Sequence, residues 1–104
     1  MPQEAFGVAF SQHASPERAA LFAATQRPIA VACIQEKLPR PAWKVTPSWY
    51  LVAEEDRMIN ATIQLFMAER MDARIRSEKV DHTPLATAPE LVIEMILEAV
   101  ASSA

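Results

Sequence analysis

Asp56 and His82 are the two residues whose types and spacing could do chemistry together. Each follows a segment expected to be a β-strand, residues 48–53 before Asp56 and residues 73–80 before His82. Neighbouring parallel strands bring the loops at their carboxyl ends side by side on one rim, where α/β sheets place their sites. A carboxylate bound to one imidazole nitrogen fixes the tautomer of a histidine and stabilises its cationic form. The sequence therefore places Asp56 and His82 on one rim, where such a pair could move a proton. From the residues alone, a loop-capping aspartate and a surface histidine are the favoured interpretations.

The elements that must position this pair follow from the hydrophobic pattern. Residues 48–53 (SWYLVA) form a continuous apolar run, typical of a strand covered on both faces. Asn60 is expected to cap a helix over residues 61–72. The predicted buried face of this helix is Ile63, Phe66, Met67, Arg70 and Met71. With the weaker strand at 73–80, this order predicts two parallel strands joined by a right-handed crossover, and hence the α/β class.

Further helices are expected before this unit. Ser15 as N-cap and Pro16 at the first helical position indicate one helix start. Residues 28–37 favour a second short helix. Residues 1–14 carry no periodic pattern, and three prolines make residues 38–47 an extended connector.

The C-terminal end of the unit is expected to close with another helix. Residues 81–86 are expected to form a loop. Residues 87–90 (TAPE) match a capping box, and the apolar residues 91–101 follow it as the closing helix.

Composition narrows the classes of function. The chain has 104 residues, 51% of them hydrophobic, which is typical of one folded domain. Its net charge of −3 gives no support to nucleic-acid binding. The single cysteine excludes an internal disulfide and a Cys-rich zinc site. No uncharged run approaches the roughly 18–20 apolar residues of a membrane span, and the first residues lack a signal-peptide pattern. We therefore expect a soluble, cytoplasmic protein with no nucleic-acid or membrane partner, no cofactor and no metal.

Other residues with chemical potential have ordinary structural explanations. Cys33 lies in an apolar helical stretch, and we expect it to be a buried small hydrophobe rather than a nucleophile. Three aromatic residues could line an acyl pocket, but packing beside the strand is favoured: Trp43, Trp49 and Tyr50. Four carboxylates could attract a divalent cation, but an ordinary acidic rim is favoured: Glu54, Glu55, Asp56 and Asp81.

Several segments together resemble the C-terminal portion of α/β-hydrolase-fold proteins, in the esterase-like branch with cap helices. These segments are QRP (26–28), PSWYLVA (47–53), EDRMI (55–59), DH (81–82) and APE (88–90). In that family, the loop after a late strand carries the acid of the Ser-His-Asp triad, and this position matches Asp56. The loop after the last strand carries the triad histidine, and this position matches His82. The chain order of acid before histidine is also that of the family.

The segments that resemble the family do not include its nucleophile. The family's G-x-S-x-G elbow needs two glycines because its turn is too sharp for a Cβ, and this chain has one glycine, Gly7. The segment that would form an oxyanion hole is also missing. The serines fall in expected caps, strand starts or tails: Ser11, Ser15, Ser48, Ser77, Ser102 and Ser103. In addition, Asp81 stands where the family usually has a small residue, and it could hold His82 in an unproductive orientation.

The resemblance implies a single, partial domain over residues 1–104. It is a truncated α/β-hydrolase-like unit whose core, residues 48–101, has two parallel strands, a crossover helix and a C-terminal helix. Cap-like helices over residues 15–38 precede this core. Because two strands leave open sheet edges, we expect a homodimer through an exposed edge or through apolar helices. The alternative is that a missing N-terminal hydrolase segment covers these surfaces.

Three functions remain open from the sequence. The first is a hydrolase-like protein that retains the triad acid and histidine but no nucleophile, is not catalytic alone, and serves binding or assembly. The second is part of a carboxylesterase-like serine hydrolase whose serine comes from another chain or from a missing N-terminal segment. The third is a small-molecule binding protein that uses residues 16–37 as a lid.

Overall fold

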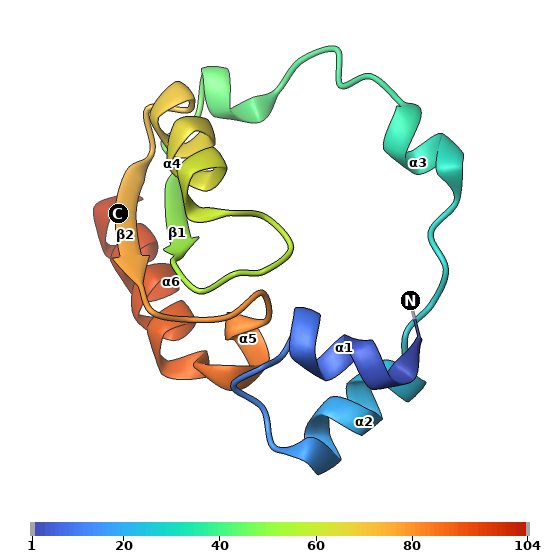
Figure 1. Cartoon of the computed structure of the whole chain (residues 1–104). Coiled ribbons are helices and arrows are strands. Elements are labelled where there is room, and N and C mark those ends of the chain that lie inside the picture. Colours follow the sequence, from blue (N-terminus) through green and yellow to red (C-terminus); the bar gives the residue numbers. More distant parts are fainter. Residues whose placement is uncertain (1, 104) are drawn as a thin grey trace.

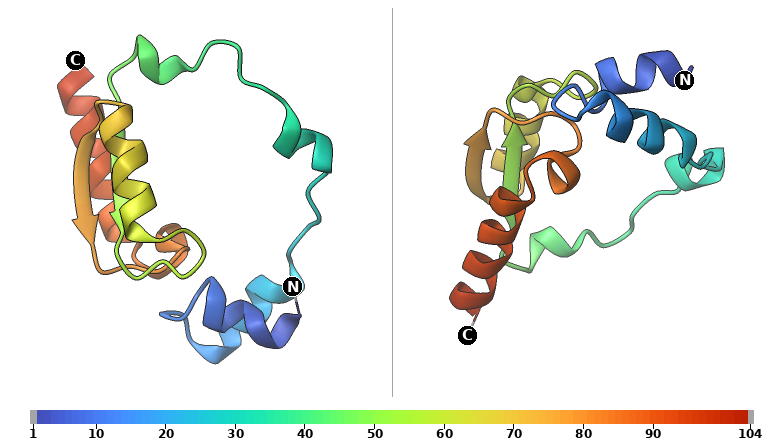
Figure 2. Two further views of the ribbon diagram at one scale, coloured as in Figure 1. Left: turned by 45° about the horizontal axis from the view of Figure 1, so that its top comes forward. Right: turned by 90° about the horizontal axis from the view of Figure 1, so that it is seen from below.

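Two parallel strands lie between two helices, on one side of an open ring of chain (Figures 1 and 2). The computed structural model describes residues 2–103. Its strands are β1 (Trp49–Ala53) and β2 (Arg74–Glu78), which pair in parallel. α4 (Ala61–Arg70) connects them, and α6 (Pro89–Ser103) packs on the sheet from the other side. This arrangement confirms the predicted α/β class with two parallel strands and a crossover helix.

Five shorter helical elements complete the chain. They are α1 (Gln3–Ala9), α2 (Pro16–Ala24), α3 (Val31–Gln35), the 3-10 helix η1 (Ala42–Lys44) and α5 (Pro84–Thr87). α1 and α2 pack against each other below the ends of the strands, and α5 leads into α6 (Figure 1).

Two of the three predicted helix caps are confirmed, those at Ser15 and Asn60. The Ser15 hydroxyl accepts a hydrogen bond from Arg18 N at 3.2 Å, which satisfies a free amide in the first turn of α2. Asn60 does the same for α4, since its Oδ1 accepts from Ile63 N at 2.9 Å. These local signals are reliable because the cap residue and its partner lie three positions apart.

Several predicted boundaries are wrong. Residues 1–14 contain α1, the predicted connector contains η1, and the predicted loop over 81–86 contains most of α5. The capping box is also not formed as predicted. The Thr87 hydroxyl donates to Thr83 O and to the Asp81 carboxylate, so it is engaged at the candidate site rather than at the start of α6.

The predicted buried face of α4 is largely wrong. Ile63 is 49% exposed and Phe66 is 63% exposed, whereas Gln64 and Ala68 are buried. The physical reason is that the sheet is two strands wide, so α4 rests on it through one narrow stripe. Gln64 occupies that stripe because its amide binds the backbone of Ala53. Apolar side chains beside the stripe consequently face outward.

The predicted burial of Cys33 is wrong as well. Cys33 is exposed, and α3 has no buried residue. After α2, residues 26–47 run along the far side of an open ring before they return to β1 (Figure 1). Three views place α3 opposite the strands (Figures 1 and 2). An apolar sequence does not bury a short helix when no other element packs against it.

The chain exposes more surface than a compact monomer of its mass. Its accessible surface is 7806 Å², against about 5,800 Å² expected from the usual scaling with mass. Its radius of gyration is 15.4 Å, against about 13 Å for a compact domain of this length. An excess of about 2,000 Å² therefore remains uncovered. It includes many large apolar side chains, among them Leu21, Ile34, Leu38, Val45, Phe66, Leu97 and Val100.

The small core lies beneath the rim that carries the candidate site. Ala53 at the end of β1, Val80 after β2 and Ala88 before α6 form one buried cluster, on which Leu91 packs. The ends of both strands are thus fixed by packing, and the loops that follow them start from fixed positions. Ala68 of α4 is fully buried on the other side of the sheet.

Enlarging Ala68 tests this packing. Ala68→Leu is expected to lower the free energy of unfolding by about 1–3 kcal/mol, because no space remains between α4 and the sheet. Thr62→Leu, at an exposed position of the same helix, is the control and is expected to change it by less than about 0.5 kcal/mol. Urea denaturation measures both. Equal effects of the two substitutions would contradict the packing of α4 described above.

Candidate functional site

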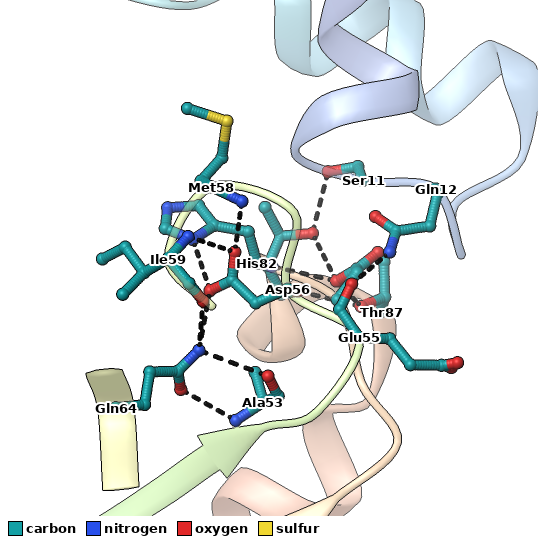
Figure 3. A network of polar contacts seen from close by, with 12 residues as sticks. Ser11, Gln12, Ala53, Glu55, Asp56, Met58, Ile59, Gln64, His82 and Thr87 are labelled. Carbon is teal, nitrogen blue, oxygen red and sulfur yellow. Dashed lines mark hydrogen bonds and ion pairs between the residues drawn. The ribbon is translucent and has the colours of Figure 1, made fainter. Parts of the chain in front are cut away.

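The structure brings Asp56 and His82 together. His82 Nδ1 lies 2.8 Å from Asp56 Oδ2, and the two side chains come from the loops that follow β1 and β2 (Figure 3). The Asp56 side chain is 6% exposed and that of His82 is 30% exposed. An ionised carboxylate only accepts hydrogen bonds, so Nδ1 donates and Nε2 is left as the basic nitrogen of the neutral ring. The predicted geometry is therefore present, while the catalytic role of the pair stays a prediction.

Asp56 is held by its own loop. Its Oδ1 accepts hydrogen bonds from Met58 N at 2.7 Å and Ile59 N at 3.0 Å. Burial acts to raise the pKa of Asp56, but the hydrogen bonds from Ile59, His82 and Met58 outweigh it and lower the pKa below its usual value. The carboxylate is therefore ionised at neutral pH and available to orient the imidazole.

Gln64 joins this loop to the end of β1, and the sequence analysis missed it. Its Oε1 accepts from Ala53 N at 2.9 Å, and its Nε2 donates to Ala53 O, Ile59 O and Asp56 Oδ2 at 3.2, 2.7 and 3.3 Å (Figure 3). Gln64 is 4% exposed. A glutamine on a helix normally indicates a solvated position, so the sequence offers no signal for this role.

Asp81 has a structural task separate from that of His82. It is fully buried and accepts four hydrogen bonds, from Thr83 N, Thr83 Oγ1, Thr87 Oγ1 and His13 N, at 2.8 to 3.1 Å. Burial acts to raise its pKa, but these bonds outweigh burial and lower the pKa. The expectation that Asp81 could misdirect the imidazole is wrong, because the hydrogen bonds of its carboxylate go to these partners.

Residues 11–13, the turn between α1 and α2, dock onto the loops of the site. Ser11 Oγ lies 2.8 Å from Thr83 Oγ1, and Gln12 Nε2 donates to Glu55 O at 2.6 Å. The His13 ring lies 3.1 Å from the Glu55 carboxylate. These contacts join residues far apart in the sequence, 72 positions in the case of Ser11 and Thr83. This separation explains why residues 1–14 carry no local pattern that reveals them.

Phe10, the residue that follows α1, also contacts His82 directly. The Phe10 ring lies edge-on to the imidazole with centroids 5.1 Å apart, and it stacks on Phe6 at 4.8 Å. Arg57, one residue after the site aspartate, donates to Val8 O at 2.7 Å. The N-terminal helix thus forms one wall of the site.

No serine of the described residues is bonded to His82. Each serine hydroxyl has another partner: Ser11 with Thr83, Ser15 with Arg18, Ser48 with Thr46, Ser77 with Glu54, Ser102 with Arg74 and Ser103 with Ala99. The single glycine lies in α1, where an added Cβ would come within 3.0 Å of Ala19 Cβ. Gly7 thus serves the close approach of α1 and α2 and forms no elbow.

An open apolar cleft of about 490 Å³ adjoins His82. It lies between β1, α5 and α6, and its main lining residues are Trp49, Leu51, His82, Leu85, Met95 and Ile96. The buried Trp49 indole N–H has no hydrogen-bond partner. None of the lining residues comes from the segment 16–37, so the predicted lid does not cover this cleft.

Neither a metal site nor a membrane span is found in the part of the chain that the structure describes. Across residues 2–103, no three His, Cys, Asp or Glu side chains converge as metal ligands. Within the same range, every helix is too short or too polar to cross a bilayer.

Comparison with known proteins adds no relative. No protein-family model matches the chain, and neither the curated proteins nor the solved structures give a match. The resemblance to α/β-hydrolases therefore rests on the sequence segments given above and stays a prediction.

Acid is expected to destabilise the fold through the two site aspartates. Because both carboxyl groups have lowered pKa values when folded, their contribution to stability is present above the ordinary aspartate pKa of about 3.9. It is lost as the pH falls below that value toward the lowered ones. The asparagine of Asp81→Asn cannot accept all four hydrogen bonds. This substitution is therefore expected to lower the free energy of unfolding by about 1–3 kcal/mol at pH 7 and to make that free energy depend less on pH in acid.

Urea denaturation between pH 7 and pH 2 measures this effect. Asp72→Asn is the control, since Asp72 is exposed and asparagine tolerates its left-handed backbone (φ 51°). If Asp81→Asn retained the stability and the acid dependence of the Asp72→Asn control, Asp81 would not hold the turn as described.

Proposed function

We propose that this chain is an α/β-hydrolase-like protein that holds the acid and the histidine of a Ser-His-Asp site and no nucleophile of its own. One observation carries the proposal: the 2.8 Å contact between His82 Nδ1 and Asp56 Oδ2, made by the loops after two adjacent parallel strands. The order of acid before histidine and the sequence resemblance support it.

The chemistry available to the pair is proton transfer. Asp56 would keep the Nδ1 proton in place, so that His82 Nε2 could take a proton from a nucleophile and return it to a leaving group. The positive charge formed on the ring would lie beside an ionised carboxylate. Because every serine hydroxyl of the described chain is bonded elsewhere, the chain by itself does not hydrolyse esters in this proposal.

A second candidate is that a serine from elsewhere completes the site. The observation in its favour is that the Asp56 carboxylate contacts His82 and the Gln64 amide in addition to the two backbone amides that a loop-capping aspartate binds. A serine from another chain, or from a segment outside residues 1–104, would then attack an ester carbonyl. His82 would relay the proton and Asp56 would orient His82.

A fluorophosphonate probe separates these two candidates. The purified chain is expected to keep its intact mass, because the probe needs an activated serine. The same labelling is then carried out on the protein isolated from its native source. A labelled serine outside residues 1–104 whose reaction is lost in His82→Ala, and kept in the control Glu54→Gln, would establish the second candidate. Labelling of the purified chain itself, lost in His82→Ala, would contradict the proposal.

The cleft favours binding of an apolar small molecule as a further candidate. Its volume of about 490 Å³ lies within the roughly 300–1,000 Å³ of ligand sites. A ligand that occupies it would raise the Tm of the purified chain, by an amount that grows with the logarithm of its concentration relative to its Kd. Apolar compounds without any effect on Tm would exclude this candidate.

We also propose that the chain forms a homodimer. The excess accessible surface exceeds the roughly 800 Å² that each partner buries in a standard interface. The open edge of β1 and one side of α6 are the candidate surfaces. On α6, exposed apolar side chains recur with helical spacing at Ile93, Ile96, Leu97 and Val100.

Leu97→Glu tests the dimer. Light scattering coupled to size exclusion is expected to give twice the chain mass for the native protein at micromolar concentration and the monomer mass for Leu97→Glu. Val45→Glu, an equally apolar and more exposed position on the connector, is expected to stay dimeric. A native protein that is monomeric at this concentration would contradict the proposal.

A further inference from the structure

Within residues 2–103, one edge of β1 has no neighbouring strand. In a parallel pair, alternate residues of a strand turn their N–H and C=O groups to the same neighbour. Just before β1, Ser48 O accepts a hydrogen bond from Arg74 N of β2. Just after β1, Glu54 N donates to Glu78 O of β2. The even-numbered residues of β1 therefore bond to β2. The backbone groups of the odd-numbered residues face the open edge: Trp49, Leu51 and Ala53.

At Ala53 this edge is closed by a side chain. The Gln64 amide accepts from Ala53 N through Oε1 and donates to Ala53 O through Nε2. This is the donor–acceptor pair that a neighbouring strand would offer with its own peptide group. Ala53 and Gln64 are both buried, so without this partner two backbone groups would lose their water and gain no bond.

The same amide group reaches the functional aspartate. The two protons of Gln64 Nε2 are shared among three acceptors, since Nε2 also lies 2.7 Å from Ile59 O and 3.3 Å from Asp56 Oδ2. Oδ2 is the oxygen that His82 Nδ1 binds. One side chain on the rigid α4 therefore fixes both ends of the loop 54–59 and touches the carboxylate that orients the imidazole.

We propose that Gln64 is the positioning residue of the Asp56–His82 pair. It stands in for a neighbouring strand at the end of β1 and thereby sets the direction of the Asp56 carboxylate. This inference rests on the proposed function, in which that pair moves a proton. A merely structural Gln64 would stabilise the fold and leave the state of the imidazole unchanged, and the two roles are therefore separable by experiment.

The test is the tautomer of neutral His82, read from the 15N chemical shifts of its two ring nitrogens. The native protein is expected to show the Nδ1–H form, because Asp56 accepts from Nδ1. Gln64→Met keeps the shape of the side chain but removes its hydrogen bonds. In this variant the Nδ1–H form is expected no longer to predominate over the Nε2–H form. Gln64→Glu is the second variant. Its carboxylate can still accept from Ala53 N, but it cannot donate to Asp56 and repels it, so it is expected to lose the Nδ1–H form as well.

Gln12→Met is the matched control. It removes the hydrogen bond to Glu55 O, next to Asp56, and is expected to keep the native tautomer. If the Gln64 variants fold and keep the native tautomer, the positioning role is overturned. Asp56→Ala distinguishes the two claims, since an Nδ1–H form that persists without Asp56 would overturn the proposed pair itself.

A second measurement covers the case in which neither Gln64 variant folds. The side-chain amide protons of Gln64 in the native protein are expected to exchange slowly, and Asp56→Ala is expected to shift their resonances and speed their exchange. Unchanged resonances and exchange in Asp56→Ala would show that Gln64 and Asp56 are not coupled, and would overturn the positioning role.

Discussion

The arrangement of the site depends on the hydrogen bonds that the ionised carboxylate of Asp56 accepts. It accepts bonds from Met58 N and Ile59 N, which shape the loop after β1, and from His82 Nδ1, which joins that loop to the one after β2. A buried carboxylate is costly unless it is satisfied in this way. The low pKa of Asp56 is the sign that its partners more than offset the cost of burial. The parallel strands supply the fixed points that make this possible, because their carboxyl ends lie side by side.

Asp81 shows how the same residue type takes a different task a short distance away. Its four hydrogen bonds join the start of α5 to the turn between α1 and α2, and they include none to His82. The N-terminal helices are thereby attached to the rim, and Phe10 reaches the imidazole. One aspartate contacts the histidine, and the other binds the turn that precedes α2. Among the described residues, the rest of the open ring formed by the chain has no comparable partner. The apolar side chains of α3, α4 and α6 are exposed for this reason.

The sequence predicted the parts of this structure that depend on local chemistry. The caps at Ser15 and Asn60, the strand at 48–53 and the proximity of Asp56 to His82 follow from neighbouring residues and from the geometry of a crossover. The docking of residues 11–13 could not be predicted, since Ser11 and His13 meet partners about 70 positions away. Gln64 was missed because it acts as the substitute for a strand, and the exposure of Cys33 was missed because an apolar helix was assumed to find a partner. The first error comes from the narrow sheet, and the second comes from the absence, within the described chain, of any element packed against α3.

A crystal structure of the purified chain tests the central claim most directly. We expect His82 Nδ1 to lie within hydrogen-bond distance of Asp56 Oδ2, near 2.8 Å, with Gln64 bridging Ala53 and Asp56 and with Asp81 turned toward the first helices. An imidazole bound to Asp81, or turned to solvent with no carboxylate on Nδ1, would contradict it.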